Sequence, residues 1–246
     1  DRARYMGDPD FIAVPVVKLA SRDYAQRRGA SIDPERATPS SELARQAAAA
    51  EEGAETTHLS IIDAEGNRVS ATLSVNGPFG SGFVAGGTGV LLNNHMDDFA
   101  LAPGAPNLYK LVGGQANAVE PGKRPLSSMS PTFVEDERGV LVLGSPGGSR
   151  IISMVLEGIL QYVDQPEIDV VHLVATPRFH HQYLPDRIEV EPGSFAEAWV
   201  DALKTKGHAV EAGRRKWGNM QAVYFDRKTG RIESANDPSG QSGVLF

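Results

Sequence analysis

The stretch that decides the fold is Thr56-Thr57-His58-Leu59-Ser60, where two threonines open a run typical of a β-strand. It follows Glu51 to Glu55, an acidic segment whose composition indicates a flexible linker. Cleavage of the Glu55–Thr56 bond would give Thr56 a free α-amino group beside its own hydroxyl. One residue would then hold both nucleophile and base, the N-terminal threonine form of covalent catalysis. Because threonine is also common in strands, the pair alone permits a purely structural role.

The composition bounds the class of protein. With 246 residues and 41% hydrophobic content, the chain can bury a core as one large domain or two small ones. A formal net charge of −7 and the lack of a basic run argue against a nucleic-acid partner. The sequence contains no cysteine, which excludes disulfides, thiolate zinc sites and a cysteine nucleophile. No apolar run reaches the roughly 18 residues that span a bilayer, and we expect any export signal to lie outside this chain.

The character of the sequence changes at Thr56. Residues 1–41 are rich in Pro, Asp and Arg and predict a peripheral arm with short helices, such as Val16 to Arg28. Glu42 to Ala50 has strong helix propensity but almost no large apolar side chain, which predicts a weakly held linker. Beyond Thr56, the alternation over His58 to Asp63 and Arg68 to Val75 predicts a β-hairpin.

Hydrophobic periodicity and turn residues predict the remaining elements. A broad apolar stripe predicts a helix over Ile151 to Val163, and a second helix follows Ser194, with a capping box at Ser194 and Glu197 and an end near Gly207. Val170 to Ala175 fits a strand by its branched residues and a short helix by its length and setting. We predict further strands at Val90 to Asn93, Thr132 to Glu135, Val140 to Leu143, Met220 to Asp226 and Arg231 to Ser234.

Three loops carry residues suited to a binding site. Gly144 to Arg150 precedes the strongest predicted helix, so its backbone N–H groups can point at an anion; a plain glycine turn is the alternative. It lacks the features of a Walker loop and of a full dinucleotide fingerprint. Asn93 to Asp98 combines amides, a histidine and carboxylates that can bind an ammonium group or form an Asx-rich turn. Arg124 to Ser130 offers hydroxyls to a carboxylate, or forms a capped loop.

Two adjacent histidines, His180 and His181, suggest metal or base chemistry. Adjacent residues on a regular element point apart, however, and no third ligand has suitable spacing. We therefore predict structural hydrogen bonds for both histidines and no metal site. Trp199 and Trp217 are assigned to packing.

Several of these stretches, in order along nearly the whole chain, resemble the gamma-glutamyltranspeptidase family of N-terminal nucleophile hydrolases. Their number and order make the match far more specific than any single motif. The stretches are Tyr5-Met6-Gly7-Asp8-Pro9-Asp10-Phe11, Thr56-Thr57-His58, Leu92-Asn93-Asn94-His95-Met96-Asp97-Asp98-Phe99, Pro125-Leu126-Ser127-Ser128-Met129-Ser130-Pro131, Gly144-Ser145-Pro146-Gly147-Gly148-Ser149-Arg150 and Pro177-Arg178-Phe179-His180-His181-Gln182.

The resemblance implies an α+β fold, a four-layer αββα sandwich of two subunits that arise when the precursor cuts itself before Thr56. Residues 1–55 then correspond to the C-terminal tail of the large subunit and a linker, and residues 56–246 to the small, catalytic subunit. The rest of the large subunit, absent from this chain, is an expected partner. Glu55 and Thr56 form the expected cleavage site.

The resemblance also implies roles for single residues. Thr56 is the expected nucleophile and its freed amine the base, since an amine pKa of about 8 leaves a neutral fraction near neutral pH. Ser74 stands where the family usually has a threonine that hydrogen-bonds the nucleophile. The other implied residues are Gly147 and Gly148 as backbone donors to the oxyanion, Ser127 and Ser128 at the α-carboxylate, Asn76, His95 and Asp98 around the α-amino group, and Tyr109 in a lid from Pro103 to Gly114.

Two departures from the family pattern bear on the substrate. The family commonly has Gln or Glu where this chain has His95, and an imidazole accepts a hydrogen bond only when neutral and repels an ammonium group when protonated. The substrate-gripping arginine of the family belongs to the large-subunit region that this chain lacks.

The activity implied is γ-glutamyl transfer from glutathione and related compounds to water, amino acids or peptides, through a threonyl ester and without cofactor or metal. The alternatives are a cephalosporin or glutaryl-amide acylase of the same family and an unprocessed, non-catalytic homologue. By resemblance to bacterial relatives, we expect a periplasmic or secreted protein.

Overall fold

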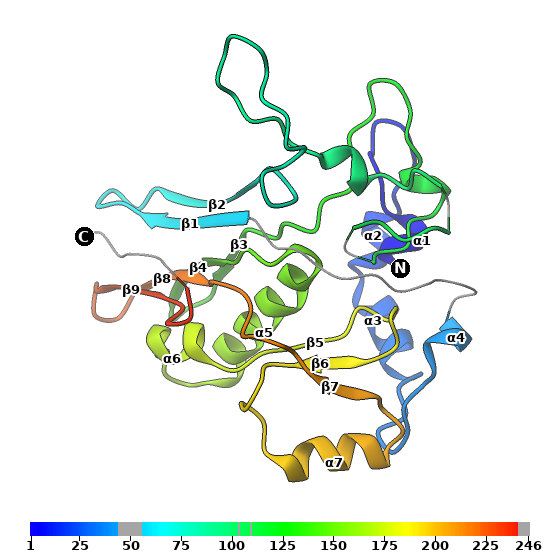
Figure 1. The fold of residues 1–246 in the computed structure, drawn as a ribbon. Helices are drawn as coiled ribbons and strands as arrows, with labels where there is room; N and C mark the ends of the chain where they lie inside the picture. Colours follow the sequence, from blue (N-terminus) through cyan, green and yellow to red (C-terminus); the bar gives the residue numbers. More distant parts are fainter. Residues whose placement is uncertain (44–55, 103, 109, 241–246) are drawn as a thin grey trace.

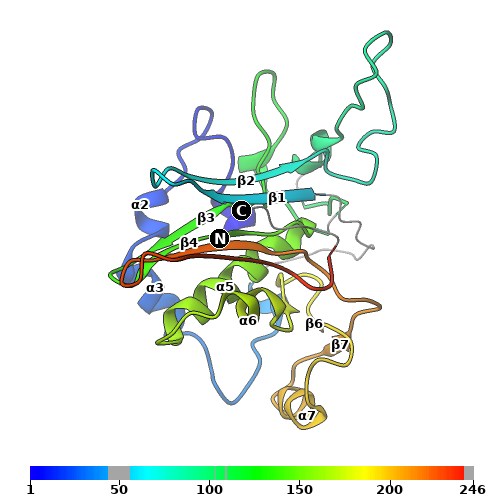
Figure 2. The same ribbon diagram turned by 90° about the vertical axis from the view of Figure 1, so that its left-hand side faces the viewer.

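The structure is a computed structural model that describes residues 1–43, 56–102, 104–108 and 110–240. Two β layers and a layer of helices stack on one another, as the two side views show (Figures 1 and 2). The expectation of an α+β fold is confirmed. Among the described residues, no helix is long and apolar enough to cross a membrane.

The central layer is an antiparallel sheet in the order β3-β4-β8-β9. Its strands are β3 (Thr132–Glu135), β4 (Gly139–Gly144), β8 (Gln221–Asp226) and β9 (Ile232–Asn236), each within about one residue of a predicted strand except at the end of β9. Every residue of β4 is buried, because this strand lies in the interior of the sheet and is covered on both faces. Its far end leads directly into the glycine loop that starts at Gly144.

Helices α5 (Ile151–Asp164) and α6 (Val170–Ala175) cover one face of this sheet (Figure 2). The helix is confirmed, and it packs on the sheet through one side that includes Ile151, Met154, Val155 and Tyr162. The predicted apolar stripe is only partly buried, because Ile152, Leu156, Leu160 and Val163 remain 41–60% exposed. Val170 to Ala175 resolves as helix because Asp169 caps it, accepting a hydrogen bond from His172 N at 2.9 Å. The core formed here comprises Leu141, Leu143, Ile151, Met154, Val155, Tyr162, Val170, Leu173, Val174, Trp217, Met220, Ala222, Tyr224 and Ala235.

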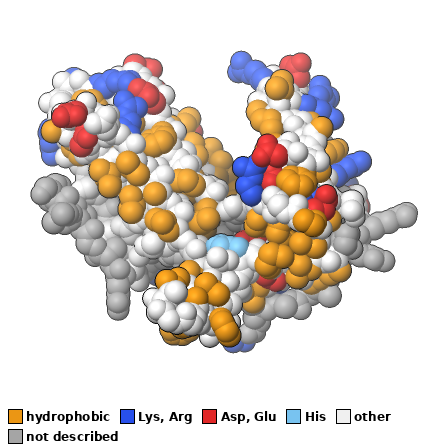
Figure 3. Space-filling model, turned by 90° about the horizontal axis from the view of Figure 1, so that it is seen from above, with side chains coloured by type: hydrophobic (Ala, Val, Ile, Leu, Met, Phe, Trp, Pro, Cys, Tyr) orange, Lys and Arg blue, Asp and Glu red, His pale blue; other side chains and the backbone are white. Residues whose placement is uncertain are grey.

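The predicted hairpin, β1 (Thr56–Ile62) and β2 (Arg68–Ser74), lies against the other face of the sheet. Its inner side is polar: Ser60 Oγ donates to Gln221 O at 3.2 Å and Ser70 Oγ to Leu143 O at 3.1 Å. The apolar residues alternate with these, so they point outward. Seen from above, hydrophobic side chains gather over the hairpin (Figure 3), and those that remain 38–53% exposed are Leu59, Ile61, Val69 and Leu73.

His58 fills the space between the hairpin and the sheet. Its ring lies so close to Gly144 that a Cβ there would be 2.2 Å from His58 Cε1. The ring nitrogens contact Thr72 Oγ1 at 2.8 Å and Ser60 Oγ at 3.0 Å. Burial lowers the pKa of His58 to about 4, so the folded protein keeps this imidazole neutral near neutral pH.

This burial predicts a pH-dependent stability. The unfolded chain takes up a proton at His58 near pH 6.5 and the folded chain near pH 4. The stabilisation that comes from keeping His58 neutral is therefore fully present above about pH 6.5. It is lost as the pH falls to about 4, and the free energy of unfolding decreases by on the order of 3 kcal/mol in all. Urea unfolding of the full-length protein between pH 4 and 7 measures it. A His58→Asn variant, which cannot titrate, should lack this part of the slope; an unchanged slope would contradict the assignment.

A third, small sheet contains β5 (Phe179–His180), β6 (Ile188–Val190) and β7 (Val210–Ala212), with β6 and β7 parallel. Helix α7 (Glu197–Thr205) connects β6 with β7 and ends before Gly207, as predicted. The predicted capping box is wrong, since the N-cap is Ala196 and Ser194 Oγ bonds to Pro192 O instead. The helix begins too late for the Ser194 hydroxyl to reach its first free N–H groups.

The N-terminal arm contains α1 (Arg2–Tyr5), α2 (Val16–Leu19), α3 (Arg22–Gly29) and α4 (Ser40–Leu43). The predicted helix over Val16 to Arg28 is split, because Ser21 caps a new helix by accepting from Tyr24 N at 3.2 Å. Ala37 N donates to Lys206 O at 2.7 Å and Ser40 N to Asp186 Oδ2 at 2.7 Å, so the arm is tied to the body. Most of Glu42 to Ala50, predicted as a weakly held linker, lies outside the described residues.

The strand predicted at Val90 to Asn93 is wrong. This segment belongs to the projecting loop after β2 (Figure 1), where it folds back on residues 81–85 through the isolated bridge Val84 to Leu91 and hydrogen bonds such as Leu92 N to Phe83 O at 2.9 Å. Val90 is 55% exposed and Leu92 40%. Glycines at positive φ around it, such as Gly87 and Gly89, turn the backbone out of the extended conformation.

Candidate active site

Thr56 meets Ser74 at the open end of the hairpin. The register of β1 and β2 pairs the two residues directly, and Thr56 Oγ1 donates to Ser74 Oγ at 3.1 Å. Ser74 Oγ also accepts from Asn76 N at 2.8 Å. Asn76 is buried and has a positive φ of 76°, a conformation that asparagine tolerates better than most residues. The hairpin thus brings together three predicted site residues, whereas Glu55 lies outside the described residues.

His95 and Asp98 extend this contact. Both lie on the 3₁₀ turn η1 (His95–Asp98), where residues three apart share a face. His95 Nδ1 is 2.7 Å from Asp98 Oδ2, and His95 Nε2 is 3.1 Å from the carbonyl oxygen of Ser74. A carbonyl only accepts, so Nε2 carries a proton. Both ring nitrogens therefore have partners within the protein, and His95 links Ser74 to Asp98.

Asp98 lies half-buried beside the N-terminal arm. Burial raises the pKa of its carboxyl, against the opposing effect of the His95 hydrogen bond and the nearby charge of Arg2. Arg2 Nη2 donates to Ser128 Oγ at 2.9 Å, so the guanidinium of Arg2 contacts one of the two serines predicted to bind a carboxylate. Ser127 is exposed, and its hydroxyl accepts from Met129 N at 3.1 Å.

Asn117, a residue without any sequence signal, joins these loops. It is buried, its Nδ2 donates to Asp98 O at 2.7 Å, and its Oδ1 accepts from Leu126 N at 3.0 Å. One amide thereby fixes the distance between the Asp98 turn and the serine loop. Arg2 was also missed, because nothing in the sequence relates an N-terminal arginine to a serine 126 positions away.

Asp8, in the first of the stretches that carry the resemblance, ties the N-terminal arm to Arg124. It is almost completely buried and accepts from Arg124 N at 2.8 Å, Nε at 3.0 Å and Nη2 at 2.6 Å. The Arg124 guanidinium holds the pKa of Asp8 far below its usual range. The arm is thus fastened to the segment that leads into Ser127 and Ser128.

Gly147 and Gly148 lie in the loop between β4 and α5, with Gly148 opening the 3₁₀ turn η3 (Gly148–Arg150). Both are buried. Gly147 has φ 144° and ψ 18°, which only glycine adopts without strain, and a Cβ there would be 2.4 Å from Met154 Cε. Glycine is therefore required where the loop turns into the helix.

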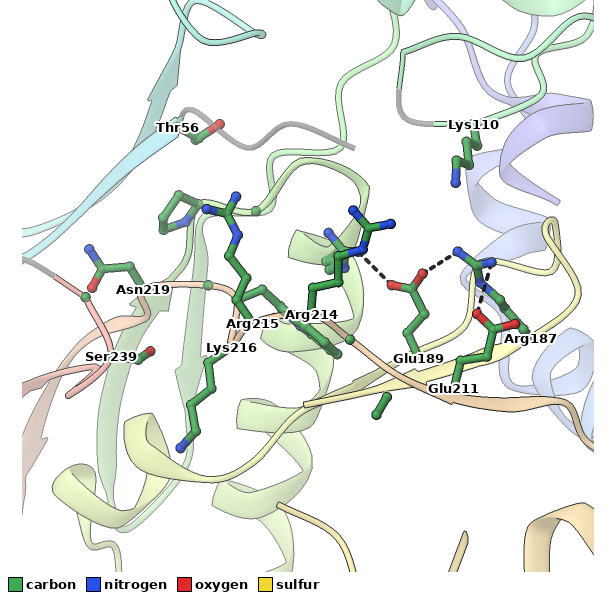
Figure 4. Close-up of a pocket in the computed structure, with 18 residues that line it drawn as sticks. Thr56, Lys110, Arg187, Glu189, Glu211, Arg214, Arg215, Lys216, Asn219 and Ser239 are labelled. Atoms are coloured by element: carbon green, nitrogen blue, oxygen red, sulfur yellow. Dashed lines mark hydrogen bonds and ion pairs between the residues drawn. The ribbon is translucent and has the colours of Figure 1, made fainter. Parts of the chain in front are cut away.

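Thr56 and Gly147 line the same cavity, of about 1000 Å³ (Figure 4). Lys110, Trp217 and a series of charged residues form its other walls. The Asp98, Arg2 and Asn117 group lines a separate small depression and is joined to Thr56 through His95 and Ser74. Tyr109 and Pro103 of the predicted lid lie outside the described residues.

The histidine pair forms hydrogen bonds with side chains nearby. His180 contacts Ser153 Oγ at 2.7 Å and Gln182 Oε1 at 3.0 Å, and His181 lies 3.3 Å from Asp186 Oδ1. In the part of the chain that the structure describes, no group of three or more His, Asp or Glu side chains could hold a metal ion. Trp199 stacks on Phe195, in keeping with a packing role.

Comparison with known proteins shows the family of this chain. The family described as Gamma-glutamyltranspeptidase matches residues 1–246. The glutathione hydrolase proenzyme of Escherichia coli (strain K12) is 47% identical over 239 residues, covering 97% of this chain and 40% of that protein. The glutathione hydrolase proenzyme of Pseudomonas aeruginosa is 42% identical over 244 residues, covering 98% of this chain and 42% of that protein.

A solved gamma-glutamyltranspeptidase from Pseudomonas nitroreducens, complexed with L-DON, superposes with a TM-score of 0.71 at 42% identity, covering 77% of this chain and 98% of that chain. The fold and the family match place the chain among the N-terminal nucleophile hydrolases. The chain belongs to the gamma-glutamyltranspeptidase family. It spans less than half the length of these two relatives, 40% of the Escherichia coli protein and 42% of the Pseudomonas aeruginosa protein.

Proposed function

We propose that the complete protein is a γ-glutamyl transfer enzyme that acts on glutathione and related compounds after cleavage before Thr56. The observation that carries the proposal is that Thr56, bonded to Ser74, and Gly147 line one cavity. A nucleophile and an oxyanion donor on the walls of one cavity are the two parts that acyl transfer requires.

The proposed reaction proceeds through a threonyl ester. Thr56 Oγ1 attacks the γ-amide carbonyl of the donor, and its proton passes to the freed α-amine of the same residue. The backbone N–H groups of Gly147 and Gly148 stabilise the tetrahedral oxyanion. When the C–N bond breaks, the ammonium of Thr56 returns the proton to the leaving amine. Water or an acceptor amine, deprotonated by the same base, then attacks the ester and releases Thr56.

Residues beyond the nucleophile would bind the glutamyl unit. Ser127 and Ser128 would bind its α-carboxylate, and Asn76 and Asp98 its α-ammonium group. The contact of Arg2 with Ser128 supports a positive field at the carboxylate end. His95 would act by holding Asp98 and Ser74 rather than by direct contact.

The proposed partner is the large subunit of the same precursor. The exposed apolar side of the hairpin supports this, since Leu59, Ile61, Val69 and Leu73 form a face suited to a packed helical layer. Such a layer would complete a four-layer sandwich, with residues 1–55 as the tail of the large subunit and 56–246 as the small subunit. A periplasmic or secreted location is also part of the proposal and rests on resemblance alone.

One observation favours a second candidate, an acylase for glutaryl amides or cephalosporins. Asp98 Oδ2 is 2.7 Å from His95 Nδ1, so a substrate ammonium group must compete with the imidazole for this carboxylate. A glutaryl unit lacks the α-amino group and makes no such demand. The two candidates share the nucleophile and differ in the group that occupies the space next to Asp98.

Mass spectrometry of the full-length precursor, combined with anilide hydrolysis, tests the proposal. We expect a fragment that begins at Thr56, faster hydrolysis of γ-glutamyl than of glutaryl anilide, and an acyl adduct on the Thr56 peptide after rapid quenching. Faster glutaryl hydrolysis would select the acylase. A precursor that stays intact on prolonged incubation and turns over neither anilide would select the non-catalytic homologue.

Replacement of His95 by glutamine should shift this preference. Glutamine keeps a hydrogen-bond donor for the Ser74 carbonyl but cannot carry a positive charge beside Asp98. We expect the ratio of kcat/KM for γ-glutamyl anilide to that for glutaryl anilide to rise about 3- to 10-fold, the range of one charge-assisted contact. An unchanged ratio would contradict this role of His95.

A further inference from the structure

The cavity that contains Thr56 has a strongly cationic wall. Its described lining residues include only two carboxylates, Glu189 and Glu211. The positively charged lining residues are Lys110, Arg150, Arg187, Arg214, Arg215 and Lys216. A cavity with this excess of positive charge attracts anionic groups toward the nucleophile.

Both carboxylates are already engaged by arginines. Glu189 accepts from Arg150 Nη2 at 2.6 Å and from Arg187 Nη2 at 2.7 Å, and Glu211 Oε2 lies 3.1 Å from Arg187 Nη1. These pairs lie at one end of the cavity (Figure 4). The excess charge therefore lies on Lys110 and, in the segment 214–216, on Arg215 and Lys216.

The segment that carries the excess charge is fixed at both ends. Gly213 N donates to Val190 O at 2.8 Å, and Trp217 N donates to Glu191 Oε1 at 3.1 Å. Glu191 is held in turn by Arg178, a buried arginine that also pairs with Asp237 at 2.6 Å. A segment anchored in this way loses little backbone entropy when it binds a ligand.

Two neighbouring cations of this segment point in opposite directions. The side chain of Arg215 extends along the cavity toward Thr56, and that of Lys216 runs away from it (Figure 4). Both residues are exposed, so a ligand can reach the Arg215 guanidinium without displacing a buried partner. Substitutions at Arg215 and at Lys216 therefore remove the same charge at two positions, one directed toward Thr56 and one directed away from it.

We propose that Arg215 binds the carboxylate at the far end of the leaving group, which for glutathione is the C-terminal carboxylate of cysteinylglycine. This inference rests on the proposed function. The donor would lie with its γ-amide between Thr56 and Gly147 and its peptide tail along the cationic wall. The planar guanidinium fork matches a carboxylate in two parallel hydrogen bonds. Peptide acceptors, which end in the same group, would use the same contact.

Kinetics of the processed, full-length protein test this assignment with two donors. Glutathione carries the distal carboxylate, and γ-glutamyl anilide has a neutral leaving group. For Arg215→Gln we expect the ratio of kcat/KM for glutathione to that for the anilide to fall about 3- to 10-fold, as is typical of one solvent-accessible ion pair. Lys216→Gln should leave the ratio unchanged, and Arg215→Lys should restore part of it. High salt should shrink the wild-type ratio toward that of Arg215→Gln.

The outcomes separate this inference from the proposed function. An unchanged ratio in Arg215→Gln overturns it. If the ratio is unchanged because kcat/KM falls equally for both donors, Arg215 has a role in folding or in subunit association. An equal fall of the ratio in Lys216→Gln also overturns it, because a general positive field would then suffice. Failure of the proposed function has a different signature, since the wild-type protein would then turn over neither donor.

Discussion

A Thr56→Ala precursor is expected to remain uncleaved and to turn over no γ-glutamyl substrate. The substitution removes the only hydroxyl that the proposed mechanism uses for both chain cleavage and acyl transfer. Loss of a nucleophile typically lowers turnover by several orders of magnitude, on the order of 10⁴-fold or more. Electrophoresis and mass spectrometry measure the cleavage, and release of aniline from γ-glutamyl anilide measures the turnover. A processed and active Thr56→Ala protein would rule out the mechanism.

The control for this prediction is Thr56→Ser, which keeps the hydroxyl and its contact with Ser74. We expect this variant to cleave and to turn over substrate at a reduced rate. Thr56 is only half-buried, so removal of its side chain should change the free energy of unfolding by about 1 kcal/mol or less. Matching melting curves for the two variants would show that a loss of activity in Thr56→Ala is chemical and not due to misfolding.

Gly147→Ala should lower kcat at least about 100-fold. The φ of 144° at this position is unfavourable for alanine, and the new Cβ would meet Met154 Cε at 2.4 Å. Met154 is completely buried, so it has little room to move. The loop must therefore shift, and the backbone N–H groups move away from the developing oxyanion, where loss of one donor costs about 10²–10³ in rate.

Gly230→Ala serves as the matched control. Gly230 also has a positive φ, 71°, but nothing lies within 4 Å of a Cβ added there. We expect a loss of about 1 kcal/mol in the free energy of unfolding and an unchanged kcat. If Gly147→Ala, folded by circular dichroism, keeps a kcat within a few-fold of wild type, Gly147 does not position an oxyanion donor.

Local sequence patterns were sufficient for much of the fold. The hairpins and α5 could be predicted because alternation and helical periodicity are properties of consecutive residues. The errors share a different cause. The Val90 to Asn93 segment has the residues of a strand, but its pairing stops at one bridge, Val84 to Leu91, where nearby glycines turn the backbone. Ser194 has the spacing of a cap but lies outside the start of the helix. In both cases the surrounding backbone overrode a local preference.

The candidate site was also predictable only in part from the sequence. The resemblance indicated Thr56, Ser74, His95, Asp98 and Gly147 as candidate site residues. It could not predict that both nitrogens of His95 bind within the protein. The supporting contacts of Arg2 with Ser128 and of Asn117 with Asp98 and Leu126 were also not predictable, because no periodic pattern relates residues on separate loops.

By itself, the sequence determined the hairpin that opens on Thr56, the glycine loop before α5 and the family to which the chain belongs, since each is written in contiguous residues. Only the tertiary structure decided that Thr56 and Gly147 line one cavity, that His95 contacts Asp98, and that Arg215 points toward Thr56 while Lys216 points away. The physical reason is that packing between elements distant in sequence selects the partners of each side chain. This packing sets the direction of the side chain and its distance from its partners, whereas the sequence sets only the residue type.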